Sequence, residues 1–325
     1  MNQIKVDFES FSWRDYTDPG PELLRQLATE LGLPERIVLN CLDTDYLPQI
    51  ETHQTVQFIV LRLMEPVSKP NASSVQELTT KVAVFVHADY VVSIHRLPLH
   101  EVEDIHKRVS AAIKSSVTKQ KLLSYFYEQV SLGFEKPLSD LEQQLDRFED
   151  TFFNKKKSKS FLRDGFYLKR KSSAFKKVLR LTLDLLVKFV GKLDCSPEHF
   201  QESKDRLERC LFYAEDVQEN IQSLLNLHMS IESQKTNEAS FKTNEIMRVL
   251  TVLTIFFLPL NFIVGLFGMN FAHIPFLQHE YGFWFSVGMM FLISILLGVY
   301  LFKQGWLSKP DIVLDQKSSY RDQNS

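Results

Sequence analysis

The stretch that decides the fold is residues 244–270, NEIMRVLTVLTIFFLPLNFIVGLFGMN. Within it, residues 249–267 run for 19 residues without a charged side chain, and residues 282–302 form a second uncharged run of 21. A helix needs about 20 predominantly apolar residues to cross the hydrocarbon core of a bilayer. The two runs therefore predict two transmembrane helices towards the end of a chain of 325 residues.

Charge placement predicts how these helices are oriented. Basic residues precede the first run and follow the second: Lys235, Lys242, Arg248, Lys303 and Lys309. Residues 270–282 contain no lysine or arginine, and the opening MNQIKVDFESF lacks the apolar core of a signal peptide. Because lysine and arginine accumulate in cytoplasmic segments, we expect both termini in the cytoplasm and a short outer loop. The expected location is the plasma or inner membrane of a cell.

Upstream of the spans, the first 100 residues show strand signals. Val56–Met64 and residues 81–94 are rich in valine, isoleucine and phenylalanine, and a turn is expected near Ala88 and Asp89. From Glu101 onward charges are frequent and glycines are few, which is typical of helices. An α/β head followed by long helices is the simplest fold.

One helix is predicted to connect this head to the membrane. No proline or glycine occurs between Pro197 and Pro259, and proline suits the start of a helix. Apolar residues follow at steps of three and four in the first part of this helix: Phe200, Leu207, Leu211, Ala214, Val217, Ile221 and Leu225. Such a narrow seam indicates packing along neighbouring helices, in a bundle or an oligomer.

Composition and motifs exclude several classes of function. The net charge of −2 gives no general affinity for nucleic acid, and the three cysteines form no CxxC pair. Residues 155–180 hold eleven basic residues and one acid, which fits a solvated helix face or a basic collar near lipid head groups. No HExxH, GxSxG or phosphate-binding glycine loop is present, so an enzyme is not expected.

The first span carries a polar stripe, which we call the α-stripe, with steps of three and four residues. Its members are Asn244, Met247, Thr251, Thr254, Leu258, Asn261 and Gly265. Polar side chains are costly in lipid and usually face protein or water. The stripe could therefore bind a neighbouring helix, or it could line a pore when repeated around a symmetry axis. In a pore, neutral oxygen atoms suit a hydrated hard cation such as Mg²⁺, and Met247 and Leu258 could gate by dewetting.

The predicted organisation is that of an α+β/α membrane protein with a long stalk helix that continues into the first span. The divisions are residues 1–100 (cytoplasmic α/β head), 101–243 (helical bundle and stalk), 244–268 (first transmembrane pore helix), 269–282 (outer loop), 283–303 (second transmembrane helix) and 304–325 (cytoplasmic tail).

At its outer end the first span closes with Gly268, Met269 and Asn270. This tripeptide, together with KTNEIMRVLT and PLNF upstream, resembles the CorA magnesium transporters of the metal ion transporter superfamily. In that family a Gly-Met-Asn tripeptide ends the first of two C-terminal spans. The resemblance is strong from about residue 235 to residue 306, and further upstream it rests on architecture.

The resemblance implies a homopentameric funnel that conducts Mg²⁺, and possibly Co²⁺ or Ni²⁺, through the bilayer. It implies that Gly268, Met269 and Asn270 form the selectivity filter, with the Gly268 and Asn270 carbonyl oxygens binding a hydrated ion. The α-stripe would line the pore, with hydrophobic constrictions at Met247, Leu250 and Leu258. Mg²⁺ would be both the transported and the regulatory ion, with no other cofactor. Glu215 and Asp216 lie in the right part of the long helix for regulatory binding, although a solvated acidic face explains them better.

Departures from the family pattern leave alternatives open. Many members have Met-Pro-Glu-Leu in the outer loop, where this chain has Ile274-Pro275-Phe276-Leu277, so Glu280 is the only loop carboxylate that could attract cations. His273 and His279 raise the possibility of zinc, which imidazole suits better than magnesium. The alternatives are a zinc transporter of the same superfamily and a non-conducting, membrane-anchored oligomeric scaffold or sensor.

Overall fold

The computed structural model describes the chain except residues 1, 68, 70, 114–115, 154–159, 193–197, 270–278 and 307–325. The chain divides into two compact units, Met1–His228 and Met229–Ser325. Helix α7 (Glu198–Phe267) contributes to both units, and its 70 residues correspond to about 105 Å of helix. The unbroken helix predicted from the absence of glycine and proline is confirmed.

The first unit is built on a six-stranded sheet. In spatial order its strands are β1 (Asn2–Asp7), β2 (Ser12–Thr17), β6 (Tyr90–His95), β5 (Thr79–Val86), β4 (Val56–Met64) and β3 (Gln49–His53). All neighbours are antiparallel except β2 and β6, which are parallel. The predicted strand Val56–Met64 is confirmed, and the predicted turn near Ala88 separates β5 from β6.

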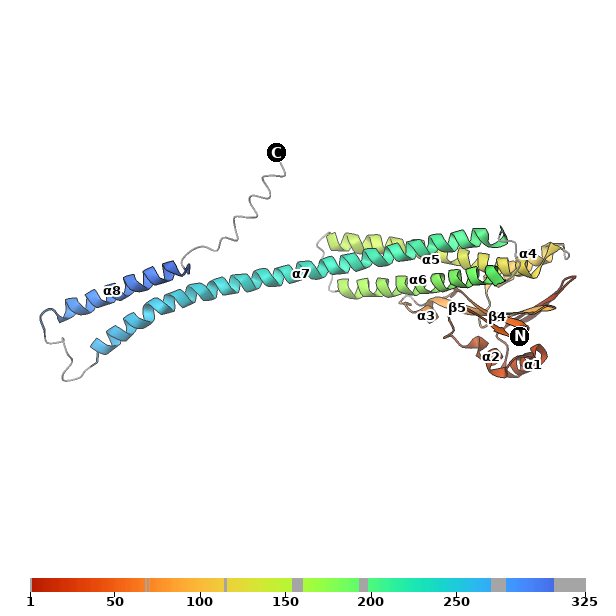
Figure 1. Ribbon diagram of the computed structural model, residues 1–325, viewed down its shortest axis with the longest axis horizontal. Coiled ribbons are helices and arrows are strands. Elements are labelled where there is room, and N and C mark those ends of the chain that lie inside the picture. Colours follow the sequence, from red (N-terminus) through yellow and green to blue (C-terminus); the bar gives the residue numbers. More distant parts are fainter. Residues whose placement is uncertain are drawn as a thin grey trace, which may run out of the picture. The chain divides into compact units, whose positions relative to one another are not determined.

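Helices cover both faces of the sheet (Figure 1). On one face, α1 (Pro21–Leu31), α2 (Glu35–Leu39) and the short 3-10 helix η1 (Asn40–Leu42) enclose a small core around Phe58 and Phe85. The other face is covered by α3 (Val75–Leu78), α4 (His100–Ala111), α5 (Lys119–Phe153), α6 (Phe161–Lys192) and the first part of α7. Because successive strand residues alternate between faces, β4 supplies Phe58 to the small core and Leu61 to the large one.

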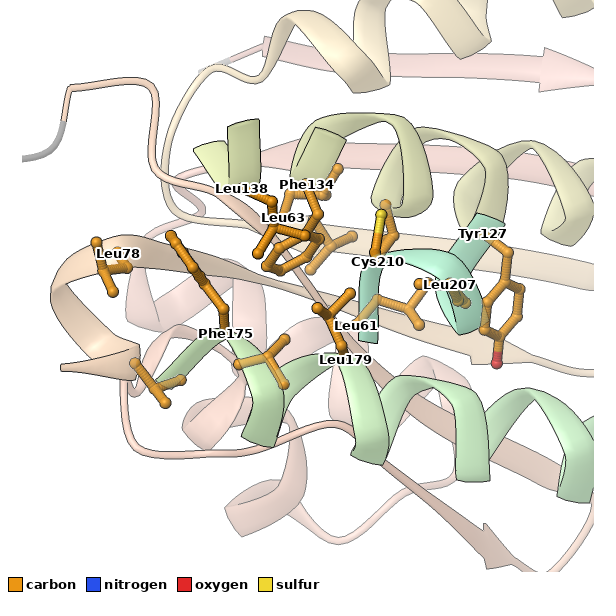
Figure 2. Packing of buried hydrophobic residues seen from close by; sticks show 14 of the residues in the cluster. Leu61, Leu63, Leu78, Tyr127, Phe134, Leu138, Phe175, Leu179, Leu207 and Cys210 are labelled. Carbon is orange, nitrogen blue, oxygen red and sulfur yellow. The ribbon is translucent and has the colours of Figure 1, made fainter. Parts of the chain in front are cut away.

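The large core joins three helices to the sheet. Figure 2 shows Phe134 of α5, Phe175 and Leu179 of α6, and Leu207 and Cys210 of α7 meeting above β4. The seam predicted in α7 is buried in this core from Phe200 to Leu225, with Leu211 partly buried. The helices and sheet of the same chain therefore bury this seam, without a second copy.

The second unit consists of the last part of α7 and helix α8 (Gly282–Lys303). The end of α7 at Phe267 and the bounds of α8 lie within one residue of the predicted spans. The predicted boundary at residue 244 falls inside α7, where the helix continues without a break. Most of the predicted outer loop and cytoplasmic tail lies outside the described residues.

Candidate functional site

Two helices of the structure are long and apolar enough to cross a membrane, namely the last part of α7 and the whole of α8. Only 6% of the apolar window in each helix is buried inside the protein. The core helix of a soluble protein would bury most of such a window. The exposure of both windows therefore supports a lipid-facing or subunit-facing environment.

Helix α8 covers one face of α7 and leaves the opposite face open. A Cβ atom at Gly298 of α8 would lie 3.8 Å from Cζ of Phe256, and Ile263 is 6% exposed. Thr254 and Leu258 lie two residues on either side of Phe256, which places them about 200° around the helix from it. Asn261 and Gly265 flank Ile263 in the same way, and all four of these residues are exposed.

Because of this placement, α8 does not pack against the α-stripe of its own chain. Asn244 and Met247 are exposed as well, and Thr251 is partly exposed. A Cβ atom at Gly265 would meet no atom within 4 Å, so Gly265 is not used for close packing against α8. In the described part of the chain, the stripe is therefore left without a partner helix.

The two threonines of the stripe donate their hydroxyl protons to backbone carbonyl oxygens of α7 itself. Oγ1 of Thr251 donates to the carbonyl oxygen of Met247 at 2.8 Å, and Oγ1 of Thr254 donates to that of Leu250 at 2.8 Å. Each hydroxyl oxygen then keeps its lone pairs free to accept a hydrogen bond. An exposed face bearing acceptors can bind the water protons of a hydrated cation.

Pro259 adds a further acceptor within the span. It lies inside α7 and has no N–H, so the carbonyl oxygen of Ile255 loses its usual donor four residues on. A backbone acceptor without a donor is costly in hydrocarbon. This oxygen is therefore left for water or for a polar group of a neighbouring helix to satisfy.

The predicted filter begins directly after α7 ends. The Gly268 N–H donates to the carbonyl oxygen of Val264 at 2.9 Å, and the Met269 N–H donates to that of Leu266 at 3.4 Å. A Cβ atom at Gly268 would lie only 3.1 Å from the same Val264 oxygen, so glycine relieves crowding at this turn. Gly268 and Met269 are exposed, and Asn270 lies outside the described residues.

Comparison with known proteins now identifies the family. The family of CorA-like Mg²⁺ transporter proteins matches residues 8–304. The chain belongs to this family. It is a membrane transporter of divalent cations rather than an enzyme, and the resemblance drawn from the tripeptide is confirmed at the family level.

The CorA relatives match nearly the full chain. The cobalt/magnesium transport protein CorA of Methanocaldococcus jannaschii is 24% identical over 317 residues, covering 93% of this chain and 94% of the relative. The protein of the same name from Thermotoga maritima is 22% identical over 295 residues, covering 88% of this chain and 80% of the relative. The complete structure of the Methanocaldococcus jannaschii CorA magnesium transporter matches with a TM-score of 0.56 and 22% identity, covering 93% and 94%. This likeness shows the predicted fold.

Other residues predicted from the CorA pattern occupy polar surfaces. Glu280 is exposed just before α8 begins. In the head, Oε1 of Glu215 lies 3.2 Å from Nζ of Lys176, and Oδ2 of Asp216 accepts from Asn220 at 3.2 Å. Among the described residues no three His, Cys, Asp or Glu side chains gather where they could hold a metal ion. Within the described part of one chain, Glu215 and Asp216 therefore do not complete a metal site.

Sequence reasoning missed a buried polar cluster in the head. Asp15 of β2 accepts from Ser93 of β6, and its Oδ2 lies 3.2 Å from Nε2 of His95 and 3.4 Å from Nε2 of His106. The Trp13 ring stacks on His106 at 3.9 Å. These residues come from β2, β6 and α4, and no pattern in the sequence predicts that they lie together.

Burial and hydrogen bonding compete in this cluster. Burial alone would raise the pKa of the Asp15 carboxyl, but the adjacent His106 imidazole and the hydrogen bonds from His95 and Ser93 outweigh burial and hold the pKa at about 2. Burial alone would lower the pKa of His95, but the hydrogen bond and charge of Asp15 raise it above the ordinary value. The cluster therefore links β6 to β2 through the buried charge pair of Asp15 and His95, and His106 of α4 lies beside this pair.

Proposed function

We propose that this chain forms a Mg²⁺ channel as a homopentamer, with five copies of α7 around the pore and α8 outside them. The observation that carries the proposal is the polar stripe on the face of α7 that α8 leaves open. Repetition around a five-fold axis would bring Thr251, Thr254 and Asn261 of each copy to one conduit. Pentameric assembly would also cover an otherwise exposed polar face in the membrane.

A hydrated ion fits the groups that the stripe supplies. Mg²⁺ gives up its water shell reluctantly, and the stripe offers neutral oxygen acceptors rather than carboxylates. The Gly268 and Asn270 carbonyl oxygens would bind the hydrated ion at the outer mouth, and Glu280 would attract it. With both termini in the cytoplasm of a plasma or inner membrane, inward movement of a divalent cation gains about 4.6 kcal/mol per 100 mV.

Gating would use apolar side chains of the same helix. Met247, Leu250 and Leu258 are each more than half exposed in the single chain. Five copies of each would form narrow apolar rings, and such rings block ions by excluding water. Mg²⁺ bound between heads through Glu215 and Asp216 would hold the channel closed, and it would have to displace Lys176 from Glu215.

The proposal is tested by flux into liposomes that contain a magnesium-sensitive dye, under a potential that is negative inside. Wild type should take up Mg²⁺ and Asn270→Ala should not, because the outer ring of carbonyl and amide groups is lost. Asn71→Ala, which changes an exposed asparagine of the head, serves as the matched control and should conduct normally.

The same vesicles separate the alternatives. Uptake of Zn²⁺ without Mg²⁺ would replace magnesium with zinc as the cargo. No uptake of Mg²⁺, Co²⁺ or Zn²⁺ by intact oligomers would favour a scaffold or sensor. Uptake of Mg²⁺ that Asn270→Ala leaves unchanged would contradict the proposed filter.

A further inference from the structure

Two cations lie opposite each other inside the head. Arg62 of β4 and Lys81 of β5 are partners in the antiparallel register, and they are only 1% and 5% exposed. Side chains at every second position of a strand share a face, so Arg62 lies on the face of Phe58 and Val60, towards the small core. Lys81 lies on the same face, two positions before Ala83. Like charges directly opposite on neighbouring strands are destabilising, so this placement calls for a compensating partner.

Only neutral groups bind the Arg62 guanidinium in the described part of the chain. Its Nε donates to Oγ1 of Thr79 at 2.7 Å, and its Nη2 donates to the carbonyl oxygen of Thr79 at 2.8 Å. Its Nη1 donates to the carbonyl oxygens of Thr44 and Tyr46, at 3.0 and 2.6 Å. A guanidinium has five N–H groups, so one of them has no partner among the described residues.

The Lys81 ammonium is held in the same way. Its Nζ donates to the carbonyl oxygen of Asn40 at 2.7 Å and lies 4.6 Å from the centre of the Tyr46 ring. Two of its three N–H groups have no hydrogen-bond partner within the residues that the structure describes. Burial lowers the pKa of Lys81 to about 8 and that of Arg62 to about 10. Both charges are therefore held at a cost that an anion would reduce.

The nearest acidic residues do not pair with these cations. Among the described residues, neither Arg62 nor Lys81 has a carboxylate oxygen within 4.0 Å. Asp43 and Asp45 are exposed, and Oδ1 of Asp43 accepts from the Asp45 N–H at 3.1 Å. Water and salt screen exposed charges more than buried ones. These acids therefore weaken the attraction of the site for an anion without neutralising the two buried cations.

A small cavity adjoins both cations. Arg62 and Lys81 line it together with Arg96, a third cationic side chain, and with Asp43, and its volume is about 10 Å³. A cavity needs about 10–15 Å³ to hold one water molecule. This cavity therefore has room for a single water or a monatomic ion, and it is too small for a phosphate or a carboxylate ligand.

We propose that a chloride ion binds in this cavity and is held by Arg62 and Lys81. The ion would accept hydrogen bonds from N–H groups that have no partner among the described residues, and it would offset the repulsion between two directly opposed cations. The same two cations hold the backbone at Asn40, Thr44 and Tyr46. Occupancy would therefore fasten this segment to β4 and β5 and stabilise the head, independently of the proposed pore.

Thermal unfolding of the full-length protein in detergent tests the site. Chloride is replaced at constant ionic strength by gluconate, which is too large for the cavity. At a chloride concentration of about ten times its dissociation constant, the melting temperature should be about 3–6 °C higher than in gluconate. Lys81→Met should lose this dependence on chloride. Lys119→Met is the matched control and should keep it, because Nζ of Lys119 donates to the carbonyl oxygens of His87 and Ala88 and does not line the cavity.

Bromide replaces chloride in a second measurement on the wild type, which needs no variant to fold. Crystals grown in bromide should show an anomalous scattering peak in the cavity, within hydrogen-bonding distance of Nζ of Lys81 and of the Arg62 guanidinium. A cavity without bromide would overturn the proposal and assign the space to water. A bromide peak without a chloride effect on wild-type melting would mean an adventitious ion only. An equal chloride effect in wild type and Lys81→Met would place the responsible site elsewhere, and either of these results would also overturn the proposal.

Discussion

Gly165→Ala tests the packing of α5, α6 and α7 in the head. A Cβ atom at Gly165 would lie 2.7 Å from Cζ of Phe148 and 2.8 Å from Cδ2 of Leu225. Phe148 cannot easily move away, because its ring stacks on Phe161 with an angle of 13° between the planes. The glycine therefore allows three helices to approach closely at one point.

The magnitude follows from two opposing effects. Alanine gains about 1 kcal/mol over glycine in the interior of a helix. Overpacking a filled core costs about 1–3 kcal/mol, and two contacts below 3 Å place this site in the upper part of that range. The net loss in the free energy of unfolding should be about 1–2 kcal/mol. For a unit of this size, the melting temperature should fall by about 2–8 °C.

Gly191→Ala is the matched control because Gly191 lies in the same helix. A Cβ atom there would meet nothing within 4 Å, so only the gain in helix propensity remains and the melting temperature should rise by a few degrees. Thermal unfolding of the full-length protein in detergent measures both variants. In a Trp284→Phe, Trp306→Phe background the buried Trp13 alone reports on the head. If Gly165→Ala is as stable as Gly191→Ala, the three-helix packing described above is wrong.

Three further predictions concern the buried charge pair and the α-stripe. Lowering the pH from about 5 to 2 should cost the head about 2 kcal/mol, because the Asp15 carboxyl stabilises the fold only while ionised, with a pKa of about 2 against about 3.9 unfolded. This acid sensitivity, followed by chemical denaturation across pH, should largely disappear in Asp15→Asn, which should also be less stable at pH 7. Leu258→Asn should raise resting Mg²⁺ uptake several-fold in liposomes, because a polar ring holds water; unchanged uptake would place the gate elsewhere. Thr254→Val should reduce the uptake rate by removing an acceptor, whereas Ser294→Ala in α8 should not, and equal effects would argue against a pore-lining role for Thr254.

The sequence predicted those parts of the fold whose signal lies within one segment. β4 and the β5–β6 hairpin are rich in valine, isoleucine and phenylalanine because both of their faces are buried, and their positions could be predicted. β1, β2 and β3 were not located individually. These strands are short and mix charged with apolar residues, as in SWRDYT of β2. Asp15 in this strand is buried beside His95 of β6 and His106 of α4, which are distant in the sequence.

The candidate site could be predicted for a similar reason. The α-stripe is a property of one helix, so its spacing is visible without any knowledge of what packs against it. The packing of α8 against the opposite face of α7 could not be predicted in this way, because Phe256 and Gly298, which lie side by side there, are 42 positions apart in the sequence. The same limit applied to the charge pair of Asp15 and His95, which are 80 positions apart.

Helix α7 carries two periodic patterns, and only the first of them is buried within the chain. The apolar seam from Phe200 to Leu225 is buried by α5, α6 and the sheet of the same chain. The α-stripe from Asn244 to Gly265 has an equally regular spacing but no partner among the described residues. A regular stripe that includes costly polar groups in a membrane helix is retained only if something covers or hydrates it. Since α8 covers the opposite face, the pore proposed above accounts for the stripe, because other copies of α7 and the water between them would cover it.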